Sequence, residues 1–232
     1  MKVGFYIPSY HRSDSLLTHK ILPFSVHVVR KSEEEKYKSV GVNVLAVDDE
    51  LIDSIPKVEN YIIENTPEDV IVILDDDIER FIYRIEENET LLDTDIVYDE
   101  IMRLAQLTVD LGIGYMSTPS DMNPKFYDRE FKFCGITGGM RIINKNKCKS
   151  RFNDIDFLND IDFELQELLQ NRIILIPNYF IADACVDVNA GGSNDNKTLR
   201  KYYLANETMK NKWGKYYVKS QNGKPGRVKV DR

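Results

Sequence analysis

The most constraining feature of this chain is residues 70–77, where five consecutive apolar residues run directly into three aspartates. A short β-branched run of this kind predicts a strand that is buried on both faces of a sheet. Asp75, Asp76 and Asp77 then lie where the strand leaves the sheet. Because three adjacent carboxylates repel one another, a fold tolerates them mainly at a surface or around a cation. The segment therefore predicts dense negative charge at the carboxyl end of a parallel strand.

Side-chain alternation gives each of these aspartates a direction. Along an extended strand, Asp75 and Asp77 lie on one side and Asp76 lies on the other. Two carboxylates on one side, with room for water and a phosphate oxygen, suit Mg²⁺ or Mn²⁺. The alternative is a solvated acidic turn that caps the following helix. We expect a divalent-metal site with Asp75 and Asp77 as ligands.

Strand and helix signals alternate over the first half of the chain. The expected strands are residues 2–7, 26–29, 42–47 and 70–74, and the expected helices are a short one ending at residue 22, 33–40 and 51–65. Ser13 or Asp14 is expected to cap the first helix. This order implies an α/β fold with a Rossmann-type, doubly wound, mostly parallel twisted sheet, helices on both faces, and ligands at the carboxyl ends of the strands. Polar residues follow each of those ends, at 9–12, 30, 48 and 75–77.

The pattern changes after Asp77. We expect helices at 95–111 and 161–169, strands at 114–117, 136–143 and 173–176, a loop at 119–132, and a Gly/Asn loop at 189–196 before a last helix. Gly138 and Gly139 interrupt one strand, and a backbone can approach a ligand closely at such a point. We expect one domain over 1–199, with halves of about 1–118 and 119–199, followed by a basic helix and tail over 200–232.

Composition is that of a soluble globular protein, and three widely spaced cysteines fit neither a disulfide framework nor a zinc site, so we expect a reducing cytoplasm. No apolar stretch approaches the ~18 residues of a transmembrane helix. The net charge of -7 is uneven, because residues 200–232 contain ten Lys and Arg against two acids, whereas residues 1–199 contain 21 against 36. The aromatic-rich basic tail could follow a polyanion, or it could form an amphipathic helix with a disordered end.

Several motifs occur in an order that resembles a known family. They are I-P-S-Y-x-R at 7–12, D-D-D at 75–77, G-G-M at 138–140, N-D-I-D-F at 159–163 and K-W-G at 212–214. The combination resembles the GT-A glycosyltransferases, and among them the TET-associated glycosyltransferases of phages. This resemblance implies a GT-A-like fold with a smaller acceptor-side sheet region. It also implies a cytoplasmic enzyme that transfers a hexose or pentose from a nucleotide-sugar, usually UDP-linked, to a hydroxymethylated pyrimidine of DNA.

On the donor side, the resemblance implies that Mn²⁺ or Mg²⁺ neutralises the leaving diphosphate. Asp75 and Asp77 would hold the metal, while Asp76 would contact the ribose or support the ligands. Tyr10 would stack on the base and Arg12 would contact the pyrophosphate, unless Tyr10 only packs and Arg12 forms a surface ion pair. The expected donor-binding residues are Pro8, Ser9, Tyr10, Arg12, Asp48 (to the uracil imide), Asp76, Gly191, Gly192, Lys197 and Arg200.

GT-A enzymes often complete the metal shell with a C-terminal histidine, but all three histidines here precede the acidic strand. Asp187, Asn189 or water would have to replace that ligand. Gly191 and Gly192 could fold over a donor, although an ordinary loop before a helix has the same composition.

The N-D-I-D-F motif stands where GT-A enzymes often carry an acidic pair at the start of a helix. Asp160 is expected to be the general base that takes the proton of the acceptor hydroxyl, with Asp162 as an orienting or substitute carboxylate. Such a base favours inversion at the anomeric carbon. Asn159 stands where many relatives have an acid, and a helix cap is the competing interpretation of these residues.

The acceptor side is expected to include Gly138, Gly139 and Met140, followed by a basic run at 141–151. A DNA base would have to be flipped out of its stack to reach the sugar. Two other enzymes fit the same residues, namely a glycosyltransferase of cell-surface glycan synthesis and a nucleotidyltransferase. A catalytically silent DNA-binding module is the non-enzymatic alternative.

Overall fold

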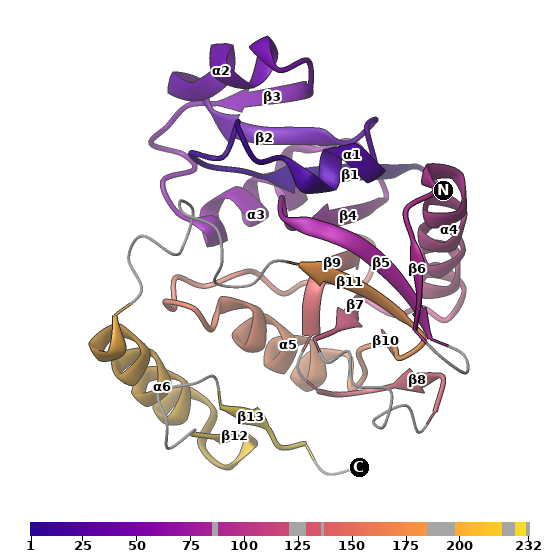
Figure 1. The fold of residues 1–232 in the computed structure, drawn as a ribbon. Coiled ribbons are helices and arrows are strands. Elements are labelled where there is room, and N and C mark those ends of the chain that lie inside the picture. Colours follow the sequence, from indigo (N-terminus) through magenta and orange to yellow (C-terminus); the bar gives the residue numbers. More distant parts are fainter. Residues whose placement is uncertain (85–87, 121–128, 136, 185–197, 220–225, 231–232) are drawn as a thin grey trace.

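The fold is built on a central six-stranded sheet (Figure 1). The structure, a computed structural model, describes residues 1–84, 88–120, 129–135, 137–184, 198–219 and 226–230. The strands of the central sheet are β1 (Val3–Pro8), β2 (Val26–Arg30), β3 (Asn43–Val47), β4 (Val70–Leu74), β7 (Tyr115–Pro119) and β9 (Thr137–Asn144). Their order is β3-β2-β1-β4-β9-β7; the pairs among the first four are parallel, and β9 is antiparallel to both of its neighbours. The predicted α/β class with a mostly parallel sheet is confirmed.

Helices cover both faces of this sheet, because the strands beneath them are apolar on both sides. The helices are α1 (Leu17–Ile21), α2 (Glu34–Ser39, after the 3₁₀ turn Lys31–Glu33), α3 (Ile55–Asn65), α4 (Thr94–Asp110), α5 (Asn159–Gln170) and α6 (Leu199–Trp213). In β4, Val70, Val72 and Leu74 pack in one apolar cluster with α1 and α4, whereas Ile71 and Ile73 pack in a second with α3 and α5. The side chain that follows Leu74 therefore belongs on the face of α3 and α5.

A smaller sheet is present, which the family resemblance implied but local sequence patterns did not locate. It consists of β5 (Ile78–Arg84), β6 (Asn88–Leu91) and β11 (Phe180–Ala184), in the antiparallel order β11-β5-β6. Phe81 of β5 stacks on Phe180 of β11, with ring centroids 5.3 Å apart. A two-residue pair, β8 (Phe131–Lys132) with β10 (Ile176–Pro177), lies partly within the expected loop 119–132. β11 pairs with β5, and β10 with β8, across long stretches of sequence, and local patterns do not report such pairing.

Two helix starts differ from the prediction. The first helix begins at Leu17 without a side-chain cap, and the Ser13 hydroxyl donates to Asp14 instead of to the helix. The amides of Leu17 and Thr18 donate to the backbone oxygen of Asp76, which ties the start of α1 to the acidic segment. The expected helix 51–65 begins only at residue 55, next to Pro56, because proline is favoured in the first turn.

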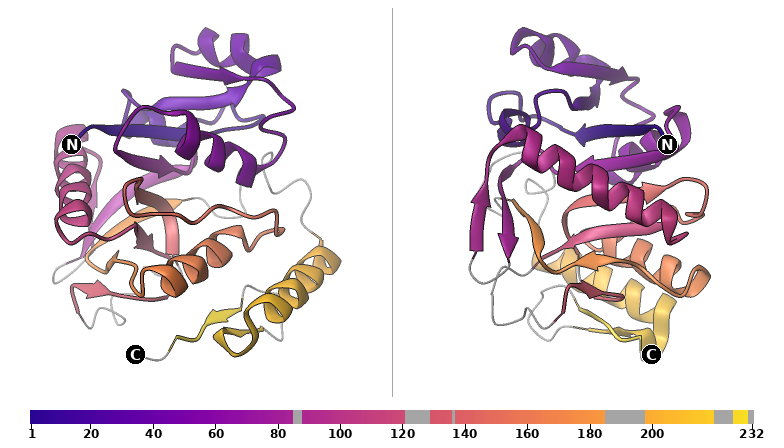
Figure 2. Two further views of the ribbon diagram at one scale, coloured as in Figure 1. Left: turned by 180° about the vertical axis from the view of Figure 1, so that it is seen from behind. Right: turned by 90° about the vertical axis from the view of Figure 1, so that its right-hand side faces the viewer.

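The last helix lies against α5, as both views of Figure 2 show. Ile161 and Leu165 of α5 form a buried cluster with Ala205 and Met209 of α6, and Tyr217 completes it. Tyr217 belongs to β12 (Tyr217–Val218), which pairs with β13 (Arg227–Val228) after the turn Gly214–Tyr216. Within the described ranges, no helix is long and apolar enough to cross a membrane.

Candidate active site

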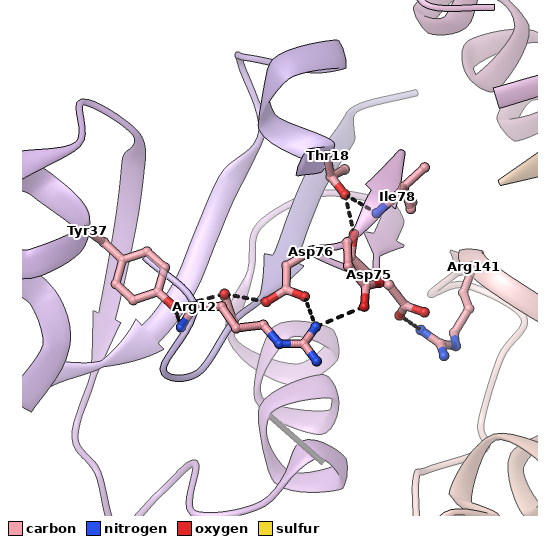
Figure 3. Close-up of polar contacts among 9 residues, drawn as sticks. Arg12, Thr18, Tyr37, Asp75, Asp76, Ile78 and Arg141 are labelled. Atoms are coloured by element: carbon pink, nitrogen blue, oxygen red, sulfur yellow. Dashed lines mark hydrogen bonds and ion pairs between the residues drawn. The ribbon is translucent and has the colours of Figure 1, made fainter. Parts of the chain in front are cut away.

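The three aspartates after β4 do not continue the strand alternation. One Arg12 nitrogen, Nη1, lies 2.6 Å from Asp76 Oδ1 and 3.0 Å from Asp77 Oδ2, so the two carboxylates share one guanidinium (Figure 3). Asp75 points elsewhere, and its Oδ1 lies 3.1 Å from Nη1 of Arg141. β4 ends at Leu74 and the backbone turns there, so strand alternation does not decide the directions of Asp75 and Asp77, and their joint role as metal ligands stays a prediction.

The loop after β1 is fixed from several sides. Ser9 donates to Asp76 Oδ2 at 2.5 Å, and the Tyr37 hydroxyl lies 2.8 Å from Ser9 Oγ and accepts from the backbone amide of Arg12. The amide of His11 donates to Glu33, while His11 itself adopts φ 56°. A non-glycine residue holds such a conformation only where its surroundings enforce it. The loop is thus preorganised around the acidic segment.

The charge of this acidic segment is only partly compensated. Burial raises the pKa of Asp76, and the Ser9 and Arg12 hydrogen bonds oppose the rise. Burial, followed by the charges of Asp75 and Asp76, raises the pKa of Asp77 to about 6, despite Arg12. Excess negative charge of this kind is what a divalent cation relieves.

The donor set suits an oxygen-preferring metal ion that takes further ligands from water and a diphosphate. Asp75 and Asp77 both offer carboxylate oxygens, and the side chain of Asp75 is 40% exposed. Among the residues that the structure describes, no group of three or more His, Cys, Asp or Glu side chains forms a complete metal site. The ligands Asp187 and Asn189, expected to add to the shell, lie outside the described residues, as do Gly191, Gly192 and Lys197.

A buried ionic cluster adjoins Asp75 on the face of α3 and α5. Arg141 of β9 lies 3.4 Å from Glu59 of α3 as well as 3.1 Å from Asp75. Burial raises the pKa of Glu59 to about 7, with Arg141 opposing and Asp75 reinforcing the rise. Asn159, at the start of α5, donates to the second oxygen of Glu59 at 3.1 Å. Arg141 was expected in a basic run on the acceptor side, but its side chain is buried in this cluster.

The two aspartates of α5 have different surroundings. Burial raises the pKa of Asp160. The positive charge of Arg141 opposes this rise and the negative charge of Asp75 adds to it, so Asp160 interacts electrostatically with the acidic segment. Asp162 is fully buried and accepts hydrogen bonds from Asn153, Gln166, Lys212 and Trp213. Its contacts lead to α6 rather than to Asp75, so the expected pairing of Asp162 with Asp160 is not formed.

The expected base-binding residues, Tyr10 and Asp48, follow the ends of β1 and β3. The Tyr10 ring stacks on His11, with centroids 3.8 Å apart, and the Arg30 guanidinium carbon lies 4.0 Å from the Tyr10 centroid. Asp48 is exposed and lies 3.2 Å from Lys31 Nζ. Pro8 ends β1 beside Val28, and Arg200 is exposed in the first turn of α6.

Of the two glycines of β9, Gly139 lies against Asp75 and Gly138 lies against Pro119. Gly139 accepts from the amide of Asp75 at 2.8 Å, and a Cβ on Gly139 would lie 3.1 Å from Asp75 Oδ2. A Cβ on Gly138 would lie 2.7 Å from the backbone oxygen of Pro119. Met140 is fully buried and pairs with Leu74, so its side chain belongs to the core and not to an acceptor site.

The family of the chain follows from its sequence. The model of the TET-Associated Glycosyltransferase family matches residues 3–192, most of the chain. The chain belongs to this family. The resemblance inferred from the motifs is thereby confirmed, and membership supports glycosyltransferase activity. No curated protein matches this TET-associated glycosyltransferase.

Solved structures share the fold of this TET-associated glycosyltransferase at low sequence identity. Glucosyl-3-phosphoglycerate synthase of M. tuberculosis has a TM-score of 0.53 and 11% identity, with 95% of this chain and 84% of that chain covered. Its complex with Mn²⁺, UDP-glucose and glycerol 3-phosphate has the same TM-score and identity, with 99% and 86% covered. A structure of residues 1–349 of S. aureus TarS has a TM-score of 0.46 and 12% identity, with 91% and 66% covered. The synthase likeness shows the GT-A fold.

Sequence reasoning missed Tyr37 and Glu59 of the site, and it assigned Arg141 to a basic run on the acceptor side. Tyr37 and Glu59 lie on helices and gave no motif. Arg141 carried a usable signal, because it directly follows Met140, and a strand that buries Met140 on one face turns Arg141 toward the other.

Proposed function

We propose that this TET-associated glycosyltransferase transfers a sugar from a UDP-sugar to a hydroxymethylated pyrimidine base of DNA, with the help of Mn²⁺ or Mg²⁺. The observation that carries the proposal is the under-compensated acidic segment at the carboxyl end of β4, where the pKa of Asp77 is raised to about 6. In open α/β sheets, ligands bind at this edge. The related synthase, solved with Mn²⁺ and UDP-glucose, supports the choice of donor and metal.

The residues of the segment divide the binding work. Asp75 and Asp77 would hold the metal ion, which when bound neutralises charge on the leaving diphosphate. Arg12 and Ser9 keep Asp76 in place and limit repulsion within the segment. Tyr10, whose ring stacks on His11 just after β1, and Asp48 would contact the nucleobase.

Asp160 is the proposed general base. Burial raises its pKa, which makes it a better proton acceptor than an exposed aspartate. It would take the proton of the acceptor hydroxymethyl group as that oxygen bonds to the anomeric carbon. The bond from the anomeric carbon to the diphosphate oxygen breaks, and its electron pair leaves with the diphosphate.

A DNA acceptor is supported by the family and by the charge of the C-terminal region. Residues 200–232 carry ten basic and two acidic residues. Arg200 and Lys215 are exposed, as are the aromatic residues Tyr203 and Tyr216. Basic and aromatic side chains together suit a strand with a flipped or unpaired base.

The direct test offers a panel of UDP-sugars with Mn²⁺ and DNA that contains hydroxymethylcytosine or hydroxymethyluracil, with mass spectrometry of the products. We expect one added sugar per modified base and none on unmodified DNA. Transfer to a glycan or small-molecule acceptor with none to DNA would reject the proposed acceptor.

Asp77→Asn tests the role of the acidic segment. It keeps the shape of the side chain but removes a metal-binding charge, so we expect transfer to fall below detection while thermal stability is retained. Asp110→Asn is the matched control, because Asp110 is exposed at the end of α4 and belongs to neither the acidic segment nor α5. Full activity of Asp77→Asn would reject the metal role of Asp77.

The DNA contact of the C-terminal region is best tested by charge removal. Truncation would remove Tyr217, which is fully buried. Replacing Arg200 and Lys215 by glutamine should weaken DNA binding and reduce its salt slope by about 0.9 for each phosphate that these side chains neutralise. Lys38→Gln on α2 is the control, and an unchanged slope would show that neither residue contacts DNA.

A further inference from the structure

Arg141 connects the two halves of the candidate site. Met140 and Ile142 of β9 face the cluster of α1 and α4, so the intervening Arg141 extends over the opposite face. There its guanidinium lies between Asp75, at the end of β4, and Glu59 of α3. Glu59 in turn accepts from Asn159, the residue next to Asp160. A continuous line of contacts thus runs from the proposed metal ligand to the helix turn that carries the proposed base.

Asp75 is held by β9 through two hydrogen bonds, and it also lies close to the backbone of Gly139. Its amide donates to the Gly139 oxygen at 2.8 Å, and its Oδ1 accepts from Arg141 at 3.1 Å. Its Oδ2 lies directly over Gly139, where an added Cβ would approach to 3.1 Å. The absence of a side chain at residue 139 therefore leaves the space that Oδ2 occupies. Because Oδ1 is engaged by Arg141, Oδ2 is the carboxylate oxygen left for a ligand.

We propose that Arg141 and Gly139 are positioning residues, which fix the carboxylate of Asp75 and so set which of its oxygens meets the donor's metal ion. Through Glu59 and Asn159, the same arginine holds the start of α5 in register with that carboxylate. This inference rests on the proposed function. It assigns to the G-G-M-R segment a role on the donor side, where the motif was expected to shape the acceptor side.

The chemistry requires arginine at this position. A planar guanidinium stays charged when buried and can contact two carboxylates along separate N–H directions. Lysine presents a single point charge and would hold one carboxylate less firmly. A neutral side chain would leave the negative charges of Asp75 and Glu59 without a compensating positive charge. Such a variant is expected to be strongly destabilised, so a change in its metal binding could not be interpreted.

The experiment measures Mn²⁺ binding in the presence of UDP, by the EPR signal of free Mn²⁺, together with kcat, KM and melting temperature. We expect Arg141→Lys and Gly139→Ala each to weaken Mn²⁺ binding about tenfold and to lower kcat, while the melting curve stays cooperative. Arg103→Lys is the matched control, since Arg103 also pairs with a carboxylate, Glu100 at 2.7 Å, but on α4. The control should bind Mn²⁺ as the wild type does.

Gly139→Ala adds one methyl group and changes no charge, so it decides the question if Arg141→Lys fails to fold. Folded variants that bind Mn²⁺ with wild-type affinity would overturn the positioning role and leave the proposed function standing. A wild-type protein that binds no Mn²⁺ with UDP would overturn both. Weakened binding in both variants, with an unchanged control, supports the positioning role whatever acceptor is identified.

Discussion

Two acidic regions of this protein meet the same electrostatic problem in different ways. Asp162, on α5, is fully buried and accepts hydrogen bonds from four side chains, two of which belong to α6. At the end of β4, three adjacent carboxylates share Arg12, Arg141 and the Ser9 hydroxyl. A buried carboxylate with a full set of donors has no capacity left for a ligand. A group of carboxylates with too few donors retains that capacity, at a cost to the stability of the fold.

The contrast also divides the N-D-I-D-F motif. The charges of Asp75 and Arg141 act on Asp160, whereas Asp162 accepts hydrogen bonds from Lys212 and Trp213 of K-W-G. Two motifs that are about fifty residues apart in the sequence therefore meet through a single carboxylate. The comparison predicts that Asp162 determines stability and that Asp160 determines rate.

The largest expected effect is the loss of stability in Asp162→Ala. Removal of the carboxylate leaves the Trp213 indole and the Asn153 and Gln166 amides without their acceptor, so we expect a loss of about 3 kcal/mol in the free energy of unfolding. Chemical denaturation at constant pH measures it. Asp156→Asn, at an exposed residue of the preceding loop, is the control. Wild-type stability of Asp162→Ala would show that the four hydrogen bonds do not hold α6 in place.

Asp160→Asn should instead slow the reaction. Loss of a positioned general base lowers kcat by about 10²–10⁴, while the KM for the donor and the melting temperature stay close to those of the wild type. Because the pKa of Asp160 is raised, the wild-type rate should fall on acidification at a higher pH than an ordinary aspartate would give. A normal kcat in Asp160→Asn would remove Asp160 from the mechanism.

These two aspartates also show which parts of the fold and of the candidate site could be predicted from the sequence. Apolar runs and helical periodicity predicted β1 to β4 and all of the longer helices, because the apolar residues of those elements recur with the period of a strand or a helix and face the core. The motifs correctly located the acidic segment and the start of α5. They put Asp160 ahead of Asp162 as general base but could not predict the hydrogen bonds of Asp162, since its partners include Trp213, whose position depends on the docking of α6. The contacts of Arg141, Glu59 and Tyr37 were not predicted for the same reason, because they join distant elements.

A third buried group, His27 of β2, avoids the cost of burying a charge because it remains neutral. Burial, reinforced by the nearby His19, lowers the pKa of His27 to about 4 from 6.5. The unfolded chain takes up the proton first, so this contribution to stability is complete above pH 6.5 and is lost as the pH falls toward 4, amounting to about 3 kcal/mol.

His27→Leu should therefore flatten the decline in the free energy of unfolding between pH 6.5 and 4, as followed by denaturant titrations across that range. His11→Asn is the matched control, because His11 is half exposed and asparagine tolerates its positive φ. If His27→Leu loses as much stability as the wild type over this range, other groups cause the decline.

The smallest effect on stability is expected at Asp48, where solvent compensates the charge. Asp48 and Lys31 are both 68% exposed, so their ion pair contributes at most a few tenths of a kcal/mol. Asp48→Ala should therefore leave the melting temperature unchanged.

If Asp48 accepts from the imide of the base, the same variant should raise the KM for a UDP-sugar about tenfold, because a hydrogen bond to a charged group is removed. Lys31→Ala separates this from the loss of the ion pair, since it removes the partner and leaves the carboxylate. Equal KM values for Asp48→Ala and the wild type would show that Asp48 does not contact the base, and base recognition would then belong to other residues.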